Sequence, residues 1–133
     1  MITEDYCSFE VAKLLKEKGF DGDGSDYECH MFYSSYSKMI MPIIEIGLVS
    51  DFDEVYYAPT HQMAMKWLRE KYNILICIIP QEIVVGYDKL CYAIYRITED
   101  LYQPLYNGKI DNLVDSYEET VEAALKYTLE KIL

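Results

Sequence analysis

The sequence predicts an α+β fold: a mostly antiparallel sheet of four to five strands with three helices, in the order α-β-β(-β)-α-β-β-α. Three segments carry apolar residues at helical spacing, and the runs between them are rich in β-branched and aromatic residues. Strands and helices are segregated along the chain, which is typical of helices packed on one sheet face. A length of 133 residues predicts a single domain, residues 1–133, with one core.

The first two predicted helices begin at a capping hydroxyl. Ser8 precedes a helix over residues 9–18, which ends where Gly19 allows a left-handed turn. Thr60 follows a proline and opens the second helix, which ends near residues 72–73 and carries Trp67 on its inner stripe.

The third helix is predicted from Ser116 to the chain end. Ser116 and Glu119 have the spacing of a capping box, in which each side chain bonds the other's backbone. Its apolar face is expected to consist of Tyr117, Val121, Ala124, Leu125, Thr128 and Ile132.

Five segments have strand composition. They are residues 29–36, 43–49, 54–57, 74–79 and 90–97. The run 74–79 has no polar face, which predicts a strand covered on both sides near the centre of its sheet. Asn107-Gly108 is the strongest hairpin signal in the chain, and Pro104 would confine any strand beside it to a sheet edge.

The charge balance limits the partners. With 23 acidic and 12 basic side chains the net charge is -11, which disfavours nucleic acids and anionic membrane surfaces. The first five residues lack the basic start of an export signal, and the longest apolar run is too short to span a bilayer. We therefore expect a cytoplasmic protein with reduced cysteines.

No catalytic or ligand motif is evident, so we expect no enzyme, no catalytic residue, no cofactor and no metal site. The acidic residues between Asp21 and Asp26 resemble the start of a calcium loop, but the required glycine and the final glutamate are missing. Cys29 and His30 with His61 lack the paired spacing of a zinc site, and neighbours in a strand point to opposite faces.

Tyrosine is the most distinctive component. Fourteen tyrosines occur beside four phenylalanines and one tryptophan, and a tyrosine ring can pack while its hydroxyl stays in water. The strand candidates place several of them on a sheet, where they would form an amphipathic patch. The predicted binding residues are Tyr33, Tyr36, Tyr57, Tyr92 and Tyr95.

These features favour a small protein-interaction module that binds a protein partner or a second copy of itself through a tyrosine-bearing sheet face or edge strand. One alternative is an acidic phage-type mimic of nucleic acid that inhibits a DNA-binding enzyme, based on the clustered aspartates and glutamates. A second alternative is a small enzyme that uses Cys29, His30 and His61.

Three blocks, residues 7–20, 58–70 and 116–127, resemble a family of small uncharacterised proteins from gut anaerobic bacteria and their prophages. The blocks cover the three predicted helices. The resemblance implies a bacterial or mobile-element origin and a short α+β domain. The family has no assigned activity, so the resemblance implies no functional residue.

Overall fold

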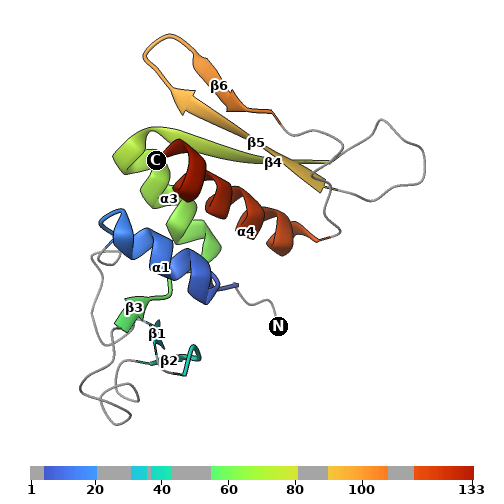
Figure 1. Ribbon diagram of the computed structural model, residues 1–133. Helices are drawn as coiled ribbons and strands as arrows, with labels where there is room; N and C mark the ends of the chain where they lie inside the picture. Colours follow the sequence, from blue (N-terminus) through green and yellow to red (C-terminus); the bar gives the residue numbers. More distant parts are fainter. Residues whose placement is uncertain (1–4, 21–30, 36, 43–54, 81–89, 108–115) are drawn as a thin grey trace. The chain divides into compact units, whose positions relative to one another are not determined.

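The computed structural model describes residues 5–20, 31–35, 37–42, 55–80, 90–107 and 116–133, and it divides into two compact units, Met1–Met63 and Ala64–Leu133 (Figure 1). The described residues form helices and two antiparallel three-stranded sheets, which confirms the α+β class. The prediction of one sheet with four to five strands is wrong, because strand pairing divides six strands between two sheets.

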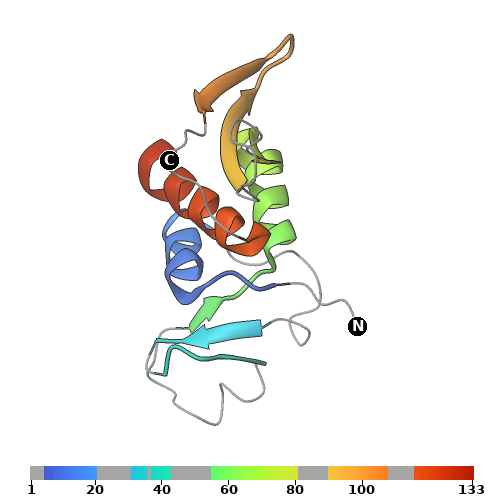
Figure 2. The same cartoon turned by 90° about the vertical axis from the view of Figure 1, so that its right-hand side faces the viewer.

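The first unit contains a short helix and a small sheet. The helix α1 covers Phe9–Glu17, and the Ser8 side chain accepts a 3.2 Å hydrogen bond from the Val11 amide, as predicted. The strands β1 (Met31–Ser34), β2 (Ile40–Pro42) and β3 (Val55–Tyr57) pair in the order β2-β1-β3, which Figure 2 shows side by side. The strand predicted at residues 43–49 lies outside the described residues.

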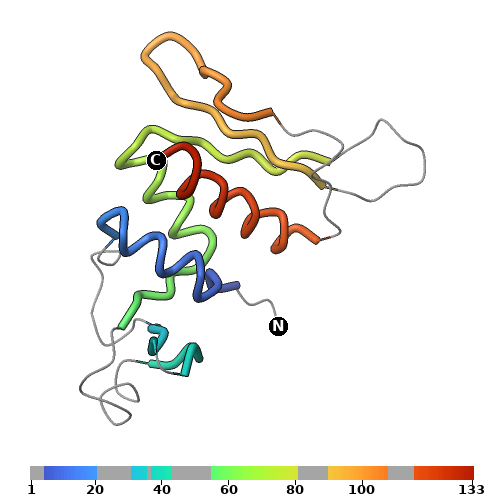
Figure 3. Tube along the Cα trace, viewed as in Figure 1, coloured from blue at the N-terminus to red at the C-terminus, as the bar shows by residue number. Residues whose placement is uncertain are grey.

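Helix α3 (His61–Tyr72) begins after Thr60, whose hydroxyl accepts a 3.3 Å bond from the Met63 amide. The boundary between the units falls inside this helix. Asn73, in the left-handed region with φ 56°, ends the helix and leads directly into β4 (Ile74–Pro80), a turn that Figure 3 traces. Trp67 is half-buried and packs on Tyr72, so the prediction that it lies in the core is not met.

The sheet of the second unit has the order β4-β5-β6, with β5 (Leu90–Ile97) in the middle and β6 (Tyr102–Tyr106) on its other side. The β5–β6 turn is closed by Thr98, whose amide and hydroxyl both donate to the Leu101 carbonyl, at 2.9 and 2.7 Å. The hairpin predicted at Asn107-Gly108 extends into residues outside the described ones, while Pro104 lies in an edge strand of the described sheet as expected.

Helix α4 (Tyr117–Tyr127) and the π-helical turn η3 (Thr128–Ile132) complete the second unit. The Ser116 hydroxyl accepts a 3.1 Å bond from the Glu119 amide, which confirms the predicted cap. Val121, Ala124 and Leu125 are buried as expected, but Tyr117 is 44% exposed and does not share their core face. A helix start near Ser116 places Tyr117 at the first turn, where its side chain extends into solvent.

The two faces of the second sheet differ. Tyr92 of β5 stacks on Tyr106 of β6 at 4.9 Å, and both contact Tyr127 of α4, so this face is the one that α4 covers. Ile74, Ile76 and Ile94 lie on the same face and are buried. We call the opposite face the outer face; it carries Leu75, Cys77, Ile79, Cys91, Ala93, Tyr95 and Ile97.

Candidate functional site

The two predicted tyrosines described in the first unit lie on opposite faces of its sheet. Tyr33 pairs with Tyr56 and contacts Phe9 of α1 edge-on, and its hydroxyl donates a 2.6 Å bond to the Cys7 carbonyl. Tyr57 pairs with Phe32 instead and packs on its ring at 4.5 Å. Tyr36 lies outside the described residues. Both described rings are half-buried and engaged within the unit.

The two predicted tyrosines of the second unit also lie on opposite faces. Tyr92 is 5% exposed, and burial, followed by the nearby Tyr106 and Tyr127 hydroxyls, raises its pKa well above the ordinary value. Tyr95 lies on the outer face and is half-exposed. Of the four predicted residues that the structure describes, Tyr95 is therefore the one that lies on the outer face of the second sheet.

Strand β4 forms one edge of the second sheet, so the prediction that residues 74–79 are central is wrong for the described residues. The Ile97 amide donates a 2.7 Å bond to the Asn73 carbonyl, and antiparallel ladders alternate bonded and non-bonded pairs. The register then turns the backbone N–H and C=O groups of Ile74, Ile76 and Ile78 away from β5. These groups form the open side of the edge.

The two edges of this sheet are protected differently. Native edge strands usually avoid pairing with other chains by charges, prolines or bulges. Strand β6 has Pro104 in its middle and a register shift opposite Ile94 and Tyr95. Strand β4 has seven residues without a charge, and its proline, Pro80, is the last of them. Of the two edges of this sheet, β4 is therefore the one that is apolar and uninterrupted.

The outer face next to this edge is apolar. Leu75, Cys77 and Ile79 of β4 are half-exposed, whereas Ile74 and Ile76 of the α4 side are buried. None of the seven outer-face residues is charged, although the chain has a net charge of -11. Cys91 and Ala93 of β5 are buried, so the half-exposed apolar side chains of this face lie mainly on β4, beside its edge.

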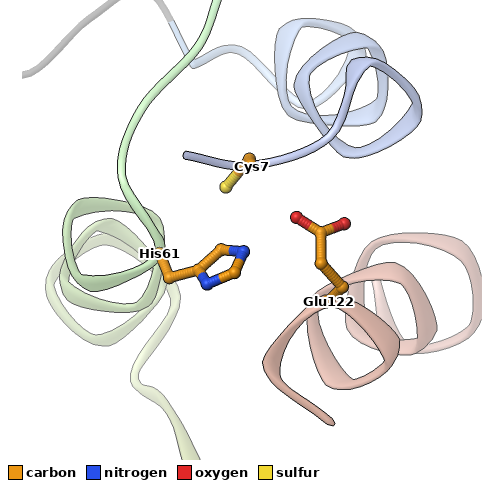
Figure 4. Close-up of side chains that lie close together, drawn as sticks. All are labelled: Cys7, His61 and Glu122. Carbon is orange, nitrogen blue, oxygen red and sulfur yellow. The ribbon is translucent and has the colours of Figure 1, made fainter. Parts of the chain in front are cut away.

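A second cluster lies in the first unit, where sequence spacing gave no signal. The Cys7 sulfur and a ring nitrogen of His61 lie within 4.8 Å of each other, and Figure 4 shows the two side chains turned toward one another. Cys7 is 0% and His61 6% exposed. Glu122, also drawn in Figure 4, is a half-buried residue of α4 in the second unit.

Backbone pairing brings Cys7 and His61 together. The Cys7 amide donates a 2.8 Å bond to the Pro59 carbonyl, and the His61 amide donates a 2.9 Å bond to the Asp5 carbonyl. Between these bonds, Tyr6 and Thr60 form an antiparallel bridge. Sequence analysis associated His61 with Cys29 and His30, which lie outside the described residues, and no local motif could have indicated a partner 54 positions away.

The acidic run 21–26 and the aspartates at 51, 53, 111 and 115 lie outside the described residues. Cys7, Cys77 and Cys91, the cysteines that the structure describes, are not in disulfides, and burial raises the pKa of Cys77.

Comparisons of the chain with protein-family models, with curated proteins and with solved structures found no match. Among the described helices, none has the length and apolarity required to cross a membrane.

Proposed function

We propose that the chain is a small cytoplasmic protein-interaction module that forms a homodimer by pairing the β4 strands of two copies. The observation that supports this proposal most strongly is the apolar edge of β4, which no other described strand covers, in contrast to the edge at β6 with its proline and register shift. A second copy fits because strand addition needs main-chain bonds and apolar neighbours, and β4 supplies both. The uncharged strand also avoids like-charge contacts between two anionic chains.

One antiparallel register makes the best use of the open backbone groups. With the two-fold axis at Ile76, this residue faces Ile76 of the second copy, and Ile74 faces Ile78 of the second copy. Each of these facing pairs can exchange two bonds, so the ladder gains roughly six. An axis at Cys77 would instead place Ile74 opposite Pro80, which has no N–H to donate. The axis at Ile76 places Leu75 opposite Cys77 of the second copy.

The first test is the molar mass in solution as a function of concentration, measured by sedimentation equilibrium. We expect a reversible monomer–dimer equilibrium for the unaltered chain. The variant Leu75→Lys places a charge on the half-exposed edge strand, and we expect its dimer dissociation constant to rise at least about tenfold, or ~1.4 kcal/mol. A monomer at every concentration would refute the dimer.

The matched control is Tyr102→Lys, which adds the same charge to the exposed edge strand β6. Its dissociation constant should equal that of the unaltered chain. If the β6 variant dissociates the dimer and the β4 variant does not, the proposed edge is wrong. Circular dichroism of both variants should retain the spectrum of the unaltered chain, which shows that both are folded.

A cross-link tests the register. In the variant Leu75→Cys, the introduced thiol faces Cys77 of the second copy in a non-hydrogen-bonded pair, where the Cα atoms are about 4.5 Å apart. A disulfide needs about 4.4–6.8 Å, so mild oxidation should give a covalent dimer. Because burial raises the pKa of Cys77, the oxidation is done at alkaline pH.

The variant Ile79→Cys serves as the control for the cross-link, because position 79 faces Asn73 of the second copy in this register. Mass spectrometry of the linked peptides identifies the bond. A link through position 79 with no link through position 75 would refute the register, while a concentration-dependent mass would still support the dimer.

A further inference from the structure

We infer that Cys7 and His61 provide two ligands of a binding site for a divalent ion of the zinc class. This inference is independent of the proposed dimer, because it concerns the first unit. Thiolate sulfur and imidazole nitrogen are the ligands that Zn²⁺ and Co²⁺ share. Both side chains are more than nine-tenths buried, and their ligand atoms lie within 4.8 Å of each other.

The distance between the ligand atoms is close to what a bound ion requires. Zinc binds sulfur at about 2.3 Å and imidazole nitrogen at about 2.0–2.1 Å, so a tetrahedral ion holds the two atoms about 3.6 Å apart. The two atoms lie within 4.8 Å of each other, so they have to approach by at most about 1 Å to bind the ion. Rotation of the side chains can supply this movement. Binding converts the Cys7 thiol to a thiolate and releases its proton to water.

The backbone around the pair is already ordered in the arrangement that the ion needs. The bonds from the Cys7 amide to Pro59 and from the His61 amide to Asp5 join the two segments in a fixed register. The hydroxyl of Tyr33, a residue of the sheet, also donates a 2.6 Å hydrogen bond to the Cys7 carbonyl. Neither ligand therefore has to be recruited from a free strand or loop, and the ordering cost of binding is small.

Two protein ligands leave two positions of a tetrahedral ion for water or for other oxygen ligands. These are fewer protein ligands than the three of a catalytic zinc site or the four of a structural one. The tetrahedral preference and the sulfur ligand distinguish the proposed site from a calcium or magnesium site, which requires oxygen ligands.

The test is titration of the full chain with Co²⁺ under reducing, oxygen-free conditions. We expect one ion per chain and a sulfur-to-cobalt charge-transfer band in the near ultraviolet. Zn²⁺ should displace Co²⁺ and abolish the band.

The variants Cys7→Ser and His61→Gln should each weaken Co²⁺ binding at least about tenfold, and the first should remove the charge-transfer band. Cys77→Ser removes a thiol elsewhere and should leave binding and band unchanged. The inference is overturned if the chain shows no band, or if the band persists in Cys7→Ser and disappears in Cys77→Ser. Circular dichroism of each variant shows that the comparison is between folded chains.

Discussion

At the scale of single residues, position 73 determines how the second unit begins its sheet. Asn73 has φ 56°. Its amide donates a 3.1 Å bond to the Arg69 carbonyl of α3, and its own carbonyl accepts a 2.7 Å bond from the Ile97 amide of β5. Asparagine tolerates this left-handed conformation better than other residues with a side chain. The residue therefore ends α3 and starts the β4–β5 ladder in one step.

A pair of substitutions tests this role. Asn73→Ala places an ordinary side chain in the left-handed region and should lower the free energy of unfolding by about 1 kcal/mol. Asn73→Gly should stay within about 0.5 kcal/mol of the unaltered chain, because glycine has no Cβ to clash. Urea unfolding followed by circular dichroism measures both. Equal losses in the two variants would show that the asparagine side chain, rather than the backbone conformation, is what matters.

The buried Tyr92 should lower the stability of the second unit at alkaline pH. Burial and the neighbouring Tyr106 and Tyr127 hydroxyls raise the pKa of Tyr92 in the folded chain. The unfolded chain then loses this proton first, so the free energy of unfolding is unaffected below pH about 10 and falls as the pH rises above it. Tyr92→Phe should reduce this fall, as measured by urea unfolding between pH 8 and pH 11.

Tyr102→Phe is the control for the alkaline series, because Tyr102 is 60% exposed. Its stability should decline with pH in parallel with the unaltered chain. A Tyr92→Phe variant that declines just as steeply would show that another group causes the loss.

At the scale of helices and strands, local signals could be predicted from the sequence and pairings between strands could not. The caps at Ser8 and Ser116 and the helix start after Thr60 each depend on residues within one turn, and all three are confirmed. Strand β5 was predicted with its observed bounds. An apolar run such as β4 has the same composition at an edge as at the centre, because strand order depends on residues distant in sequence.

The same physical limit applies to the candidate sites. Cys7 and His61 are brought together by a bridge between Tyr6 and Thr60, a long-range pairing with no local motif. Five tyrosines on strand candidates suggested one patch, but side-chain alternation places Tyr33 opposite Tyr57 and Tyr92 opposite Tyr95 across their sheets. Register therefore decides which side chains can act together.

The cap of α4 gives a prediction at this scale. Ser116→Ala removes the acceptor for the Glu119 amide and should lower the free energy of unfolding by about 1 kcal/mol. Ser116→Asp should restore it, because a carboxylate accepts the same bond and favours the positive end of the helix dipole. Thermal unfolding measures both variants. An aspartate variant as unstable as the alanine variant would show that the cap contributes little.

At the scale of the whole molecule, the acidic charge and the apolar edge have opposite effects on association. A net charge of -11 makes two copies repel one another, whereas the β4 strand has no charge of its own. The dimer would thus be held by backbone bonds and apolar contacts against a long-range repulsion. This balance can be shifted by salt without changing a residue.

Salt should strengthen the proposed dimer. Raising the ionic strength from about 0.01 M to about 0.15 M shortens the screening length from about 30 Å to about 8 Å, which weakens the repulsion between the two chains. The dimer dissociation constant should therefore fall with added NaCl in sedimentation experiments, and that of Leu75→Lys should stay at least about tenfold above it at every salt concentration. An interface held by ion pairs would respond in the opposite way, so a dissociation constant that rises with salt would exclude the uncharged β4 edge as the contact.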